Sequence, residues 1–334
     1  NWKYWLISIL SIFLIWQGIG IIPSLLTCLF INNYGISDFN CNTDNFIISG
    51  PSYIPNFILA FAPFALASIA LYIAVTRLHQ RPFISIITGR QQFDFKRLFF
   101  AMSVVSIFSA ISLLIQLSGS QFEDNIMTFN PPGLEFFIIA ILAFMLVPIQ
   151  AGLEEIFFRG YILQAFSFIT KSRYFLIIST SSLFAILHIS NPEPWEYGIT
   201  AYLSSVLILA IFMSFITVLD GGLELAIGFH IMNNLWAFLI VNLEKSVVPT
   251  PALFIANIPE FNLFTLVIPS LIQFLIFGSI FAWKYKWFKK KSLNDIHFLL
   301  FNIPFRIDYI KFNHRLLMIF NGNQRIAKIN PSRL

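Results

Sequence analysis

The chain has 334 residues, of which 57% are hydrophobic and 11% are charged, and its formal net charge is +5. With a mean hydropathy of +0.77, this composition excludes an ordinary soluble globular domain and indicates a polytopic membrane protein. No internal repeat or second soluble domain is visible, and nothing in the charge pattern suggests a nucleic acid as a partner.

Eight apolar segments are long enough to span a membrane as helices. A membrane-spanning helix needs roughly 20 apolar residues, because lipid offers the backbone no hydrogen-bond partners. The first segment is too long for a signal peptide and lacks a small-residue cleavage site, so we expect it to be retained. The sequence therefore predicts an all-α polytopic membrane protein with about eight transmembrane helices. The predicted spans are approximately 5–30, 57–76, 98–117, 136–168, 174–190, 199–219, 223–242 and 264–283.

The chain contains two cysteines, Cys28 in the first predicted span and Cys41 in the loop that follows it. Two cysteines are too few for a disulfide framework or a cysteine-rich zinc site. By themselves they do not indicate a redox compartment.

Basic residues alternate between the loops. The loops 31–56 and 118–135 contain no lysine or arginine, whereas 77–97 contains five and 169–173 contains two. Because positively charged loops stay in the cytoplasm, both termini are predicted to be cytoplasmic.

The C-terminal segment is strongly basic. Residues 284–334 hold eleven of the 21 lysines and arginines, against two acidic residues. We therefore expect a transmembrane domain at 1–288 and a tail at 289–334 that lies on the membrane surface and contacts anionic lipids.

The segment AGLEEIFFRG, residues 151–160, places three charged side chains in an apolar span. Glu154, Glu155 and Arg159 would together cost about 9 kcal/mol if they were unsatisfied in lipid. Glu155 and Arg159 are four residues apart, so they share a helix face and can form an ion pair. Glu154 lies about 100° around the helix and can point elsewhere, which leaves one carboxylate for chemistry. A purely structural ion pair is the alternative for this cluster.

Two further motifs repeat the four-residue spacing. FAILH contains Phe184 and His188, and HIMNN contains His230 and Asn234. At about 1.5 Å per residue from the cytoplasmic ends of their helices, the polar residues lie roughly 15–25 Å deep. These residues are Glu154, His188, His230 and Asn234. We expect them to meet in an intramembrane polar cavity.

This set of side chains can activate water. A carboxylate beside an imidazole can serve as a general base, and an amide with a second imidazole can stabilise an oxyanion. Alternatively, Glu154, His188 and His230 could hold zinc or another divalent metal. The sequence lacks the His-Glu-x-x-His motif of metalloproteases, a Gly-x-Ser-Gly motif and a pair of membrane aspartates, so other intramembrane protease designs are disfavoured.

In their order along successive apolar segments, EEIFFR, FAILH and HIMNN resemble the signature of the CPBP family. This family comprises CAAX proteases and bacteriocin-processing enzymes related to type II CAAX prenyl endopeptidases. The segments ITGRQQFDFKR and NPPGLEFF also resemble bacterial members, and the resemblance covers about 85–240.

The resemblance implies an intramembrane endopeptidase that cleaves a membrane-associated peptide or protein, in the plasma membrane of a bacterium. It implies that Glu154 activates water, that His188 assists or binds a metal, and that His230 with Asn234 stabilises the oxyanion. Supporting roles fall to Glu155, Arg159 and Phe184. The choice between a catalytic metal and a glutamate-activated water stays open.

Two alternatives belong to other functional classes. A proton-coupled transporter would use buried carboxylates that titrate, although no repeat relates the two halves of the chain. A non-catalytic immunity or scaffold protein would bind a peptide in the same cavity.

Overall fold

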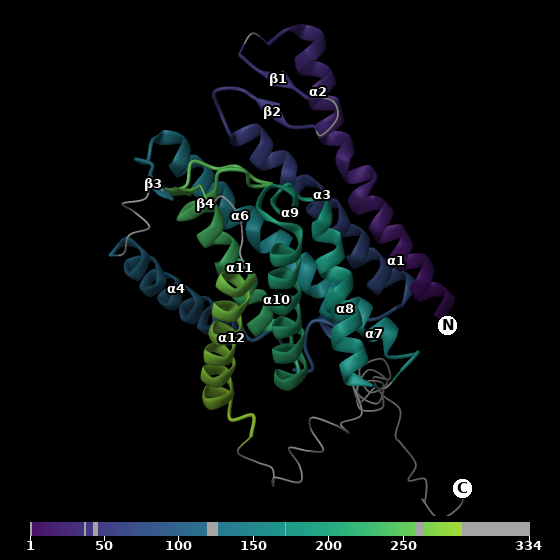
Figure 1. Cartoon of the computed structure of the whole chain (residues 1–334). Coiled ribbons are helices and arrows are strands. Elements are labelled where there is room, and N and C mark those ends of the chain that lie inside the picture. Colours follow the sequence, from purple (N-terminus) through teal and green to yellow (C-terminus); the bar gives the residue numbers. More distant parts are fainter. Residues whose placement is uncertain are drawn as a thin grey trace, which may run out of the picture. The chain divides into compact units, whose positions relative to one another are not determined.

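The computed structural model describes residues 2–36, 38–42, 46–118, 126–170, 172–257 and 263–288. Asn1–Lys290 forms one compact unit. The predicted basic tail at 289–334 lies outside the described residues, so that assignment stays a prediction. The helices, shown in Figure 1, are α1 (Trp2–Gln17), η1 (Ile19–Ile21), α2 (Ile22–Tyr34), α3 (Ile54–Ile73), η2 (Ala74–Leu78), η3 (Phe83–Ile86), α4 (Phe95–Leu117), α6 (Leu134–Glu155), η4 (Ile156–Ile162), α7 (Leu163–Phe166), α8 (Arg173–Leu187), η5 (His188–Ser190), α9 (Glu193–Tyr197), α10 (Ile199–Asp220), α11 (Glu224–Leu239) and α12 (Leu263–Tyr285).

Seven helical segments in the described part of the chain are long and apolar enough to cross a membrane, which confirms an all-α polytopic membrane protein. They match seven of the eight predicted spans. The seven are Lys3–Tyr34, Ile54–Leu78, Phe95–Leu117, Leu134–Phe166, Arg173–Ser190, Ile199–Asp220 and Leu266–Tyr285.

The predicted span at 223–242 is shorter in the structure, although it still leads from the ion pair of Glu224 to β4 (Val241–Leu243) at the other end of the helices. This segment forms α11, which has only 16 residues and gives way to a strand at Val241. At about 1.5 Å per residue, such a helix is roughly 24 Å long and falls short of the hydrocarbon core of roughly 30 Å. Its apolar composition comes from burial inside the protein, because every residue from Glu224 to Ile231 is buried.

α11 lies against α4 and α6, while α10 packs against α8 and α12 and α1 packs against α3. Where α11 approaches α4, a Cβ atom at Gly228 would collide with the backbone carbonyl oxygen of Leu98. Glycine at this position therefore allows the two helix backbones to approach closely. α11 carries His230 and Asn234, so this contact helps to fix the depth of two candidate site residues.

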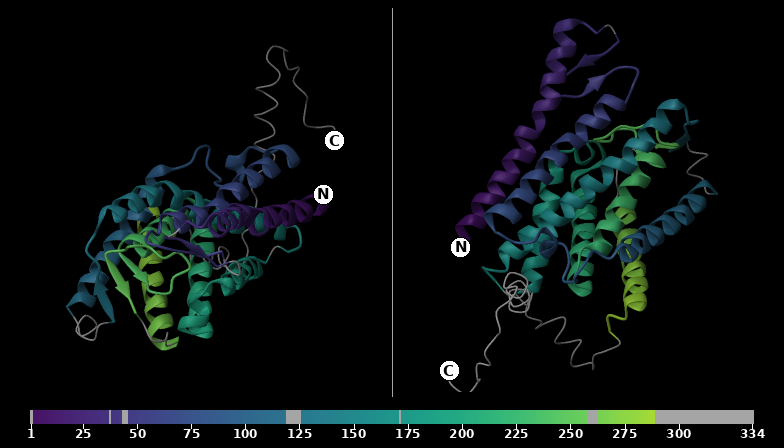
Figure 2. Two further views of the ribbon diagram at one scale, coloured as in Figure 1. Left: turned by 90° about the horizontal axis from the view of Figure 1, so that it is seen from above. Right: turned by 180° about the vertical axis from the view of Figure 1, so that it is seen from behind.

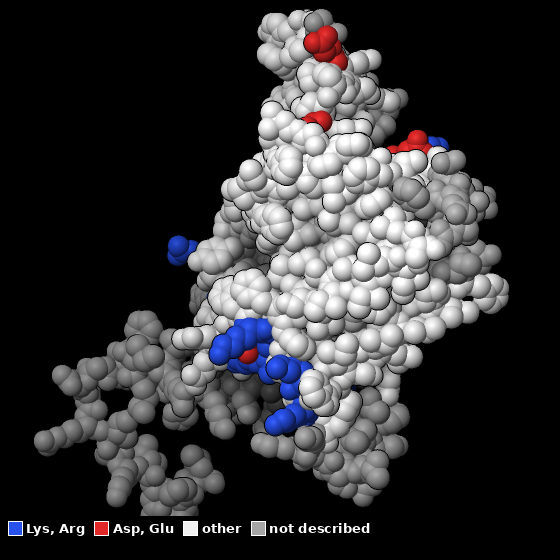
Figure 3. Space-filling model, turned by 90° about the vertical axis from the view of Figure 1, so that its left-hand side faces the viewer, with Lys and Arg blue, Asp and Glu red and all other residues white. Residues whose placement is uncertain are grey.

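The outward faces of the helices are apolar. On the face shown in Figure 3, most lysine and arginine side chains gather toward one end, and a broad uncharged surface separates them from acidic side chains at the other. Large exposed apolar side chains are the surface expected against lipid; they include Ile107, Leu114, Ile115, Phe144 and Leu275.

Two small sheets lie at the ends of helices. One pairs β1 (Asn40–Cys41) with β2 (Ile48–Ser49), and the other has the order β3 (Met127–Phe129), β5 (Phe254–Ala256), β4 (Val241–Leu243). β3 and β5 are antiparallel, whereas β4 and β5 are parallel. The carboxylate of Glu135 at the start of α6 accepts hydrogen bonds from the hydroxyl of Ser52 (2.7 Å) and the backbone N–H of Tyr53 (2.6 Å), just before α3. The end of the unit that carries these sheets and Glu135 is called the disulfide end, after the Cys28–Cys41 bond that also lies there.

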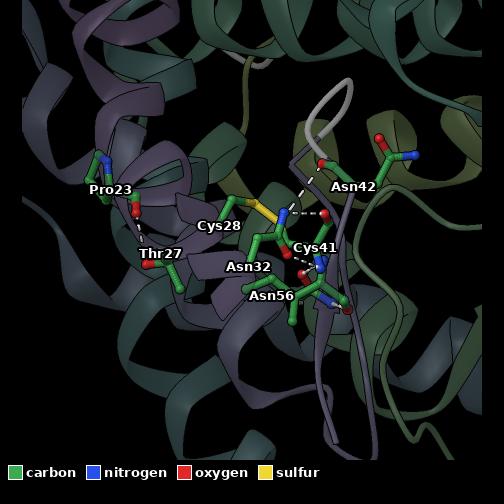
Figure 4. The surroundings of a disulfide bond; sticks show 8 residues. Pro23, Thr27, Cys28, Asn32, Cys41, Asn42 and Asn56 are labelled. Atoms are coloured by element: carbon green, nitrogen blue, oxygen red, sulfur yellow. Dashed lines mark hydrogen bonds between the residues drawn. A yellow bond between two sulfur atoms is a disulfide. The ribbon is translucent and has the colours of Figure 1, made fainter. Parts of the chain in front are cut away.

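A disulfide joins Cys28 in α2 to Cys41 in β1 (Figure 4), a pairing that the sequence did not predict. Asn32 holds the same turn, since its amide donates to the carbonyl of Cys41 at 3.0 Å and accepts from the N–H of Cys41 at 3.3 Å. Figure 2 shows α1 and α2 running on as one long helical rod, with α3 beside α1. The disulfide therefore fastens the first loop to the far end of this rod.

The opposite end, which we call the basic end, carries an ionic cluster. Arg90 contacts Asp220 at 2.8 Å and Glu224 at 3.0 Å, and Arg97 pairs with Asp220. The indole of Trp287 also donates to Asp220 at 3.1 Å. These contacts tie the loop before α4 to the turn between α10 and α11 and to the end of α12.

Candidate active site

The Glu-Glu-Arg motif lies where the long helix beginning at α6 changes its hydrogen-bond pattern. α6 ends at Glu155, and η4 continues it as a π-helix from Ile156 to Ile162. Single π segments within α-helices are frequent at functional sites, because they rotate the side chains that follow. Glu154, Glu155 and Arg159 are all buried, at 6%, 0% and 2% exposure, so their partners decide whether they are tolerated.

Glu155 and Arg159 form the predicted ion pair, with 3.2 Å between Oε1 and Nη1. Arg159 also donates to the hydroxyl of Ser214 and to the carbonyl of Ala210, both at 3.3 Å. Its guanidinium lies 4.4 Å from the ring centroid of Phe184. The cation is thus held by α10 and α8 as well as by its own helix.

His230 on α11 is oriented by the same carboxylate. Its Nδ1 lies 2.8 Å from Oε1 of Glu155, which also accepts from Arg159. An ionised carboxylate only accepts hydrogen bonds, so the proton belongs on Nδ1. Nε2 then carries the lone pair of the neutral ring, and it faces Oε2 of Glu154 at 3.5 Å.

Glu154 has capacity left for another group. Its Oε2 is buried and has no hydrogen-bond partner within the described ranges. A buried acceptor without a partner is costly, and a water molecule or a substrate group would relieve that cost. Oε2 of Glu155 has no partner among the described residues either. Its Oε1, however, is held by both Arg159 and His230, so Glu154 is the less constrained carboxylate of the pair.

Asn234 lies one turn beyond His230 on α11 and reaches toward α6. Its Nδ2 donates to Oε1 of Gln150 at 2.9 Å. Gln150 is one turn before Glu154, so a further contact links the two helices one turn from the Glu154 and His230 pair. Gln150 was not among the predicted site residues, although a polar residue in an apolar run, four positions before Glu154, could have indicated it.

His188 and Phe184 form the wall on α8. His188 Nδ1 donates to the carbonyl of Phe184 at 2.8 Å, and the two ring centroids are 4.6 Å apart. Phe184 in turn lies 6.2 Å from the ring of His230. Glu154 pairs with His230, and Phe184 lies between the two histidines, so His188 is placed at the edge of the cluster.

Three further polar residues join this region without having been predicted. Ser181 and Ser214 contact each other at 3.1 Å beneath Arg159. Glu193 on α9 accepts a hydrogen bond from the N–H of Val247 at 2.8 Å. Burial raises the pKa of Glu193 above its ordinary value of 4.5, whereas the N–H of Val247 and the imidazole of His188 act in the opposite direction. α9 therefore links the end of α8 to the segment after α11.

The predicted metal site stays a prediction. The described ranges contain no group of three or more His, Cys, Asp or Glu side chains arranged to hold a metal ion. Glu154 and His230 supply two donors, and His188 is not grouped with them. We therefore derive the chemistry from the side chains alone.

With this geometry in view, comparison with known proteins is informative. Residues 133–236 match the family described as type II CAAX prenyl endopeptidase Rce1-like. This segment is similar to that family over about a third of the chain. The match confirms the resemblance to the CPBP and CAAX protease family, and it supports an intramembrane protease at the level of the family. The Rce1-like segment contains Glu154, His188, His230 and Asn234.

A relative with a similar length is known. The chain is 26% identical over 295 residues to the uncharacterized protein YyaK of Bacillus subtilis (strain 168), which covers 87% of this chain and 94% of that protein. The similarity extends well beyond the segment that matches the Rce1-like family. No solved structure matches the chain.

Proposed function

We propose that this protein is an intramembrane endopeptidase that hydrolyses a peptide bond of a membrane-associated peptide or protein. The observation that supports it is the pair of Glu154 and His230. Oε2 of Glu154 is buried without a partner among the described residues, 3.5 Å from a ring nitrogen whose opposite side is fixed by Glu155. A carboxylate placed beside an oriented imidazole is suited to remove a proton from water.

In the proposed reaction, Glu154 accepts a proton from water as the water oxygen attacks the carbonyl carbon. The proton then passes to the leaving nitrogen as the C–N bond breaks, so the products are a carboxylate and an amine. His230 is close enough to share this proton. Glu155 stabilises the imidazolium that forms, because its carboxylate is 2.8 Å from Nδ1.

The oxyanion of the intermediate needs hydrogen-bond donors. Asn234 uses Nδ2 to contact Gln150, and the second hydrogen of this amide remains for the substrate. His188 donates through Nδ1 to Phe184, so its Nε2 offers a hydrogen bond only when the ring is protonated. We assign the oxyanion to Asn234, joined by His230 once its Nε2 has taken up the shared proton, and an assisting role to His188.

The proposal includes the membrane in which the protein lies, its orientation and its contact with lipids. The alternating basic loops support a plasma-membrane location with both termini in the cytoplasm. The disulfide between Cys28 and Cys41 agrees with this orientation, since it places an oxidised bond on the outer side. The basic tail is proposed to contact anionic lipids.

The test uses purified protein in liposomes with a set of hydrophobic peptides of about 20 residues, long enough to span the bilayer. In water enriched in heavy oxygen, hydrolysis should place the label in a new C-terminal carboxylate, which mass spectrometry detects. Glu154→Gln should abolish the labelled product. Peptide binding without cleavage by the wild-type protein would favour a scaffold, and substrate flux without cleavage would favour a transporter.

A further inference from the structure

A groove opens between α4, α11 and α12, on a different face of α11 from the Glu154 pair. Its volume is about 550 Å³. The two outer helices touch toward the basic end, where Phe100 lies 6.1 Å from Phe281 and Phe108 lies 5.0 Å from Phe277. The groove is lined by Phe108, Ser109, Ser112, Leu113, Gln116, Asn233, Trp236, Ala237, Val241, Pro269, Ile272 and Gln273.

The lining is largely apolar but contains a set of polar side chains on helices whose lipid-facing surfaces are apolar. α4 belongs to a span with a mean hydropathy of 2.4, yet it presents Ser109, Ser112 and Gln116 to the groove. These residues are spaced three and four apart, so they form one stripe along the helix. α12 adds Gln273 from the opposite wall. Within the stripe, Nε2 of Gln116 donates to the hydroxyl of Ser112 at 3.1 Å. A polar stripe facing hydrocarbon is unfavourable unless its remaining hydrogen-bonding capacity meets a partner.

α11 lies between the groove and the candidate active site and contributes residues to both. This helix is largely buried, yet Asn233 is exposed in the groove wall. The amide of Asn233 donates to Oδ1 of Asn234 at 3.3 Å, and Asn234 bonds Gln150 one turn before Glu154. A group bound in the groove would therefore lie beside the helix that carries His230 and Asn234.

The chemistry of the lining selects the kind of ligand. Its polar residues are serine, glutamine, asparagine and tryptophan, and none of the lining residues is charged. An anionic lipid headgroup would be recognised by lysine or arginine. Neutral amides and hydroxyls both donate and accept, which matches a polypeptide backbone whose N–H and C=O groups have left a helix.

We propose that this groove binds an unwound, extended stretch of the substrate polypeptide next to the catalytic residues. The inference rests on the proposed peptidase function, because a peptide bond within a helix must be unwound before water can reach its carbonyl carbon. The groove supplies hydrogen bonds to that stretch inside the membrane, where lipid supplies none.

The binding test uses the full chain with Glu154→Gln in phosphatidylcholine liposomes, so that no peptide is consumed. A benzophenone amino acid replaces Leu113 or Ile272 in the groove, or Leu114 or Leu275 on the exposed surface of the same helices. The probe is a hydrophobic peptide of about 20 residues with a central Gly-Pro pair that breaks its helix. A peptide of the same length made of leucine and alanine is the comparison.

We expect the groove positions to capture the helix-breaking peptide several-fold more than the surface positions, and more than they capture the leucine and alanine peptide. Equal capture at all four positions would overturn the proposal. So would photolabelling of the groove by a diazirine phosphatidylcholine that the peptide does not displace, because the groove would then be a lipid site.

A kinetic test uses the active protein. Gln273→Leu removes a hydrogen-bonding group and should raise KM about fivefold with little change in kcat. Ser279→Leu places the same side chain on α12 outside the groove and should leave both constants unchanged. An unchanged KM for Gln273→Leu contradicts the proposal. If the groove captures the peptide but no form of the protein cleaves it, the peptidase function fails while the groove assignment stands.

Discussion

At the scale of single residues, the two adjacent glutamates have different partners. Glu155 uses Oε1 to contact both Arg159 and His230, whereas Glu154 faces His230 alone among its described ion-pair partners. The difference follows from helix geometry, since neighbouring positions point about 100° apart. One carboxylate therefore builds the site and the other is available to act in it.

The structural role of Glu155 predicts a loss of stability. Removing one member of a buried charge pair leaves the other uncompensated, at a cost of about 3–5 kcal/mol. Glu155→Gln and Arg159→Leu should therefore lower the melting temperature in detergent. Glu196→Gln is the matched control, because its carboxylate is exposed and contacts Lys245 at the surface. Melting temperatures of the two core variants equal to that of the control would refute this role.

Glu193 gives a prediction about pH. Burial raises its pKa, so the folded state is favoured when this carboxyl group is protonated. The resulting contribution to folding stability is present at low pH and is lost as the pH rises through the folded pKa. Glu193→Gln keeps the acceptor for Val247 and cannot ionise. The melting temperature of the variant relative to wild type should therefore increase from about pH 4.5 to pH 8. A constant difference over that range would show that Glu193 does not titrate in this way.

At the scale of elements, the close approach of α11 to α4 is the contact that places His230 and Asn234. A Cβ at Gly228 meets the carbonyl of Leu98, whereas a Cβ at Gly152 in α6 meets nothing within 4 Å. Gly228→Ala should lower the melting temperature and the cleavage rate together. Gly152→Ala should leave the protein as stable or stabilise it by about 0.4–1 kcal/mol, because alanine restricts the unfolded chain. Equal effects of the two substitutions would contradict the close packing.

Sequence patterns predicted some elements well and others poorly, for physical reasons. Long apolar runs predicted seven spans, because lipid imposes a minimum length on them. At 223–242 the apolar run is longer than the helix it contains, because α11 has 16 residues and is largely buried within the protein. The spacing of Glu155 and Arg159 predicted their ion pair, because both lie on one helix.

Contacts between separate helices were harder to predict. Helical spacing does not reveal that His230, rather than His188, adjoins Glu154, because this depends on how α8 and α11 pack against α6. Asp220 pairs with Arg90 and Arg97, which lie more than a hundred residues earlier in the chain, and helical spacing gives no sign of these pairs.

At the scale of the whole molecule, the orientation can be tested through accessible cysteines. The native cysteines are joined in a disulfide and do not compete for a thiol reagent. Asn33 lies near the disulfide end and Gln91 near the basic end, and both are exposed. In intact cells, a membrane-impermeant maleimide should label Asn33→Cys and not Gln91→Cys. Labelling of Gln91→Cys alone would reverse the predicted topology.

The central claim is that Glu154 is the base of a hydrolytic reaction, held in place by a structure that does not depend on its charge. The direct measurement is peptide cleavage by Glu154→Gln in liposomes, together with its melting temperature in detergent. Glutamine keeps the shape of the side chain and removes the base, so the account predicts a melting temperature near that of wild type and no detectable cleavage. Cleavage near the wild-type rate by a folded Glu154→Gln protein would contradict it.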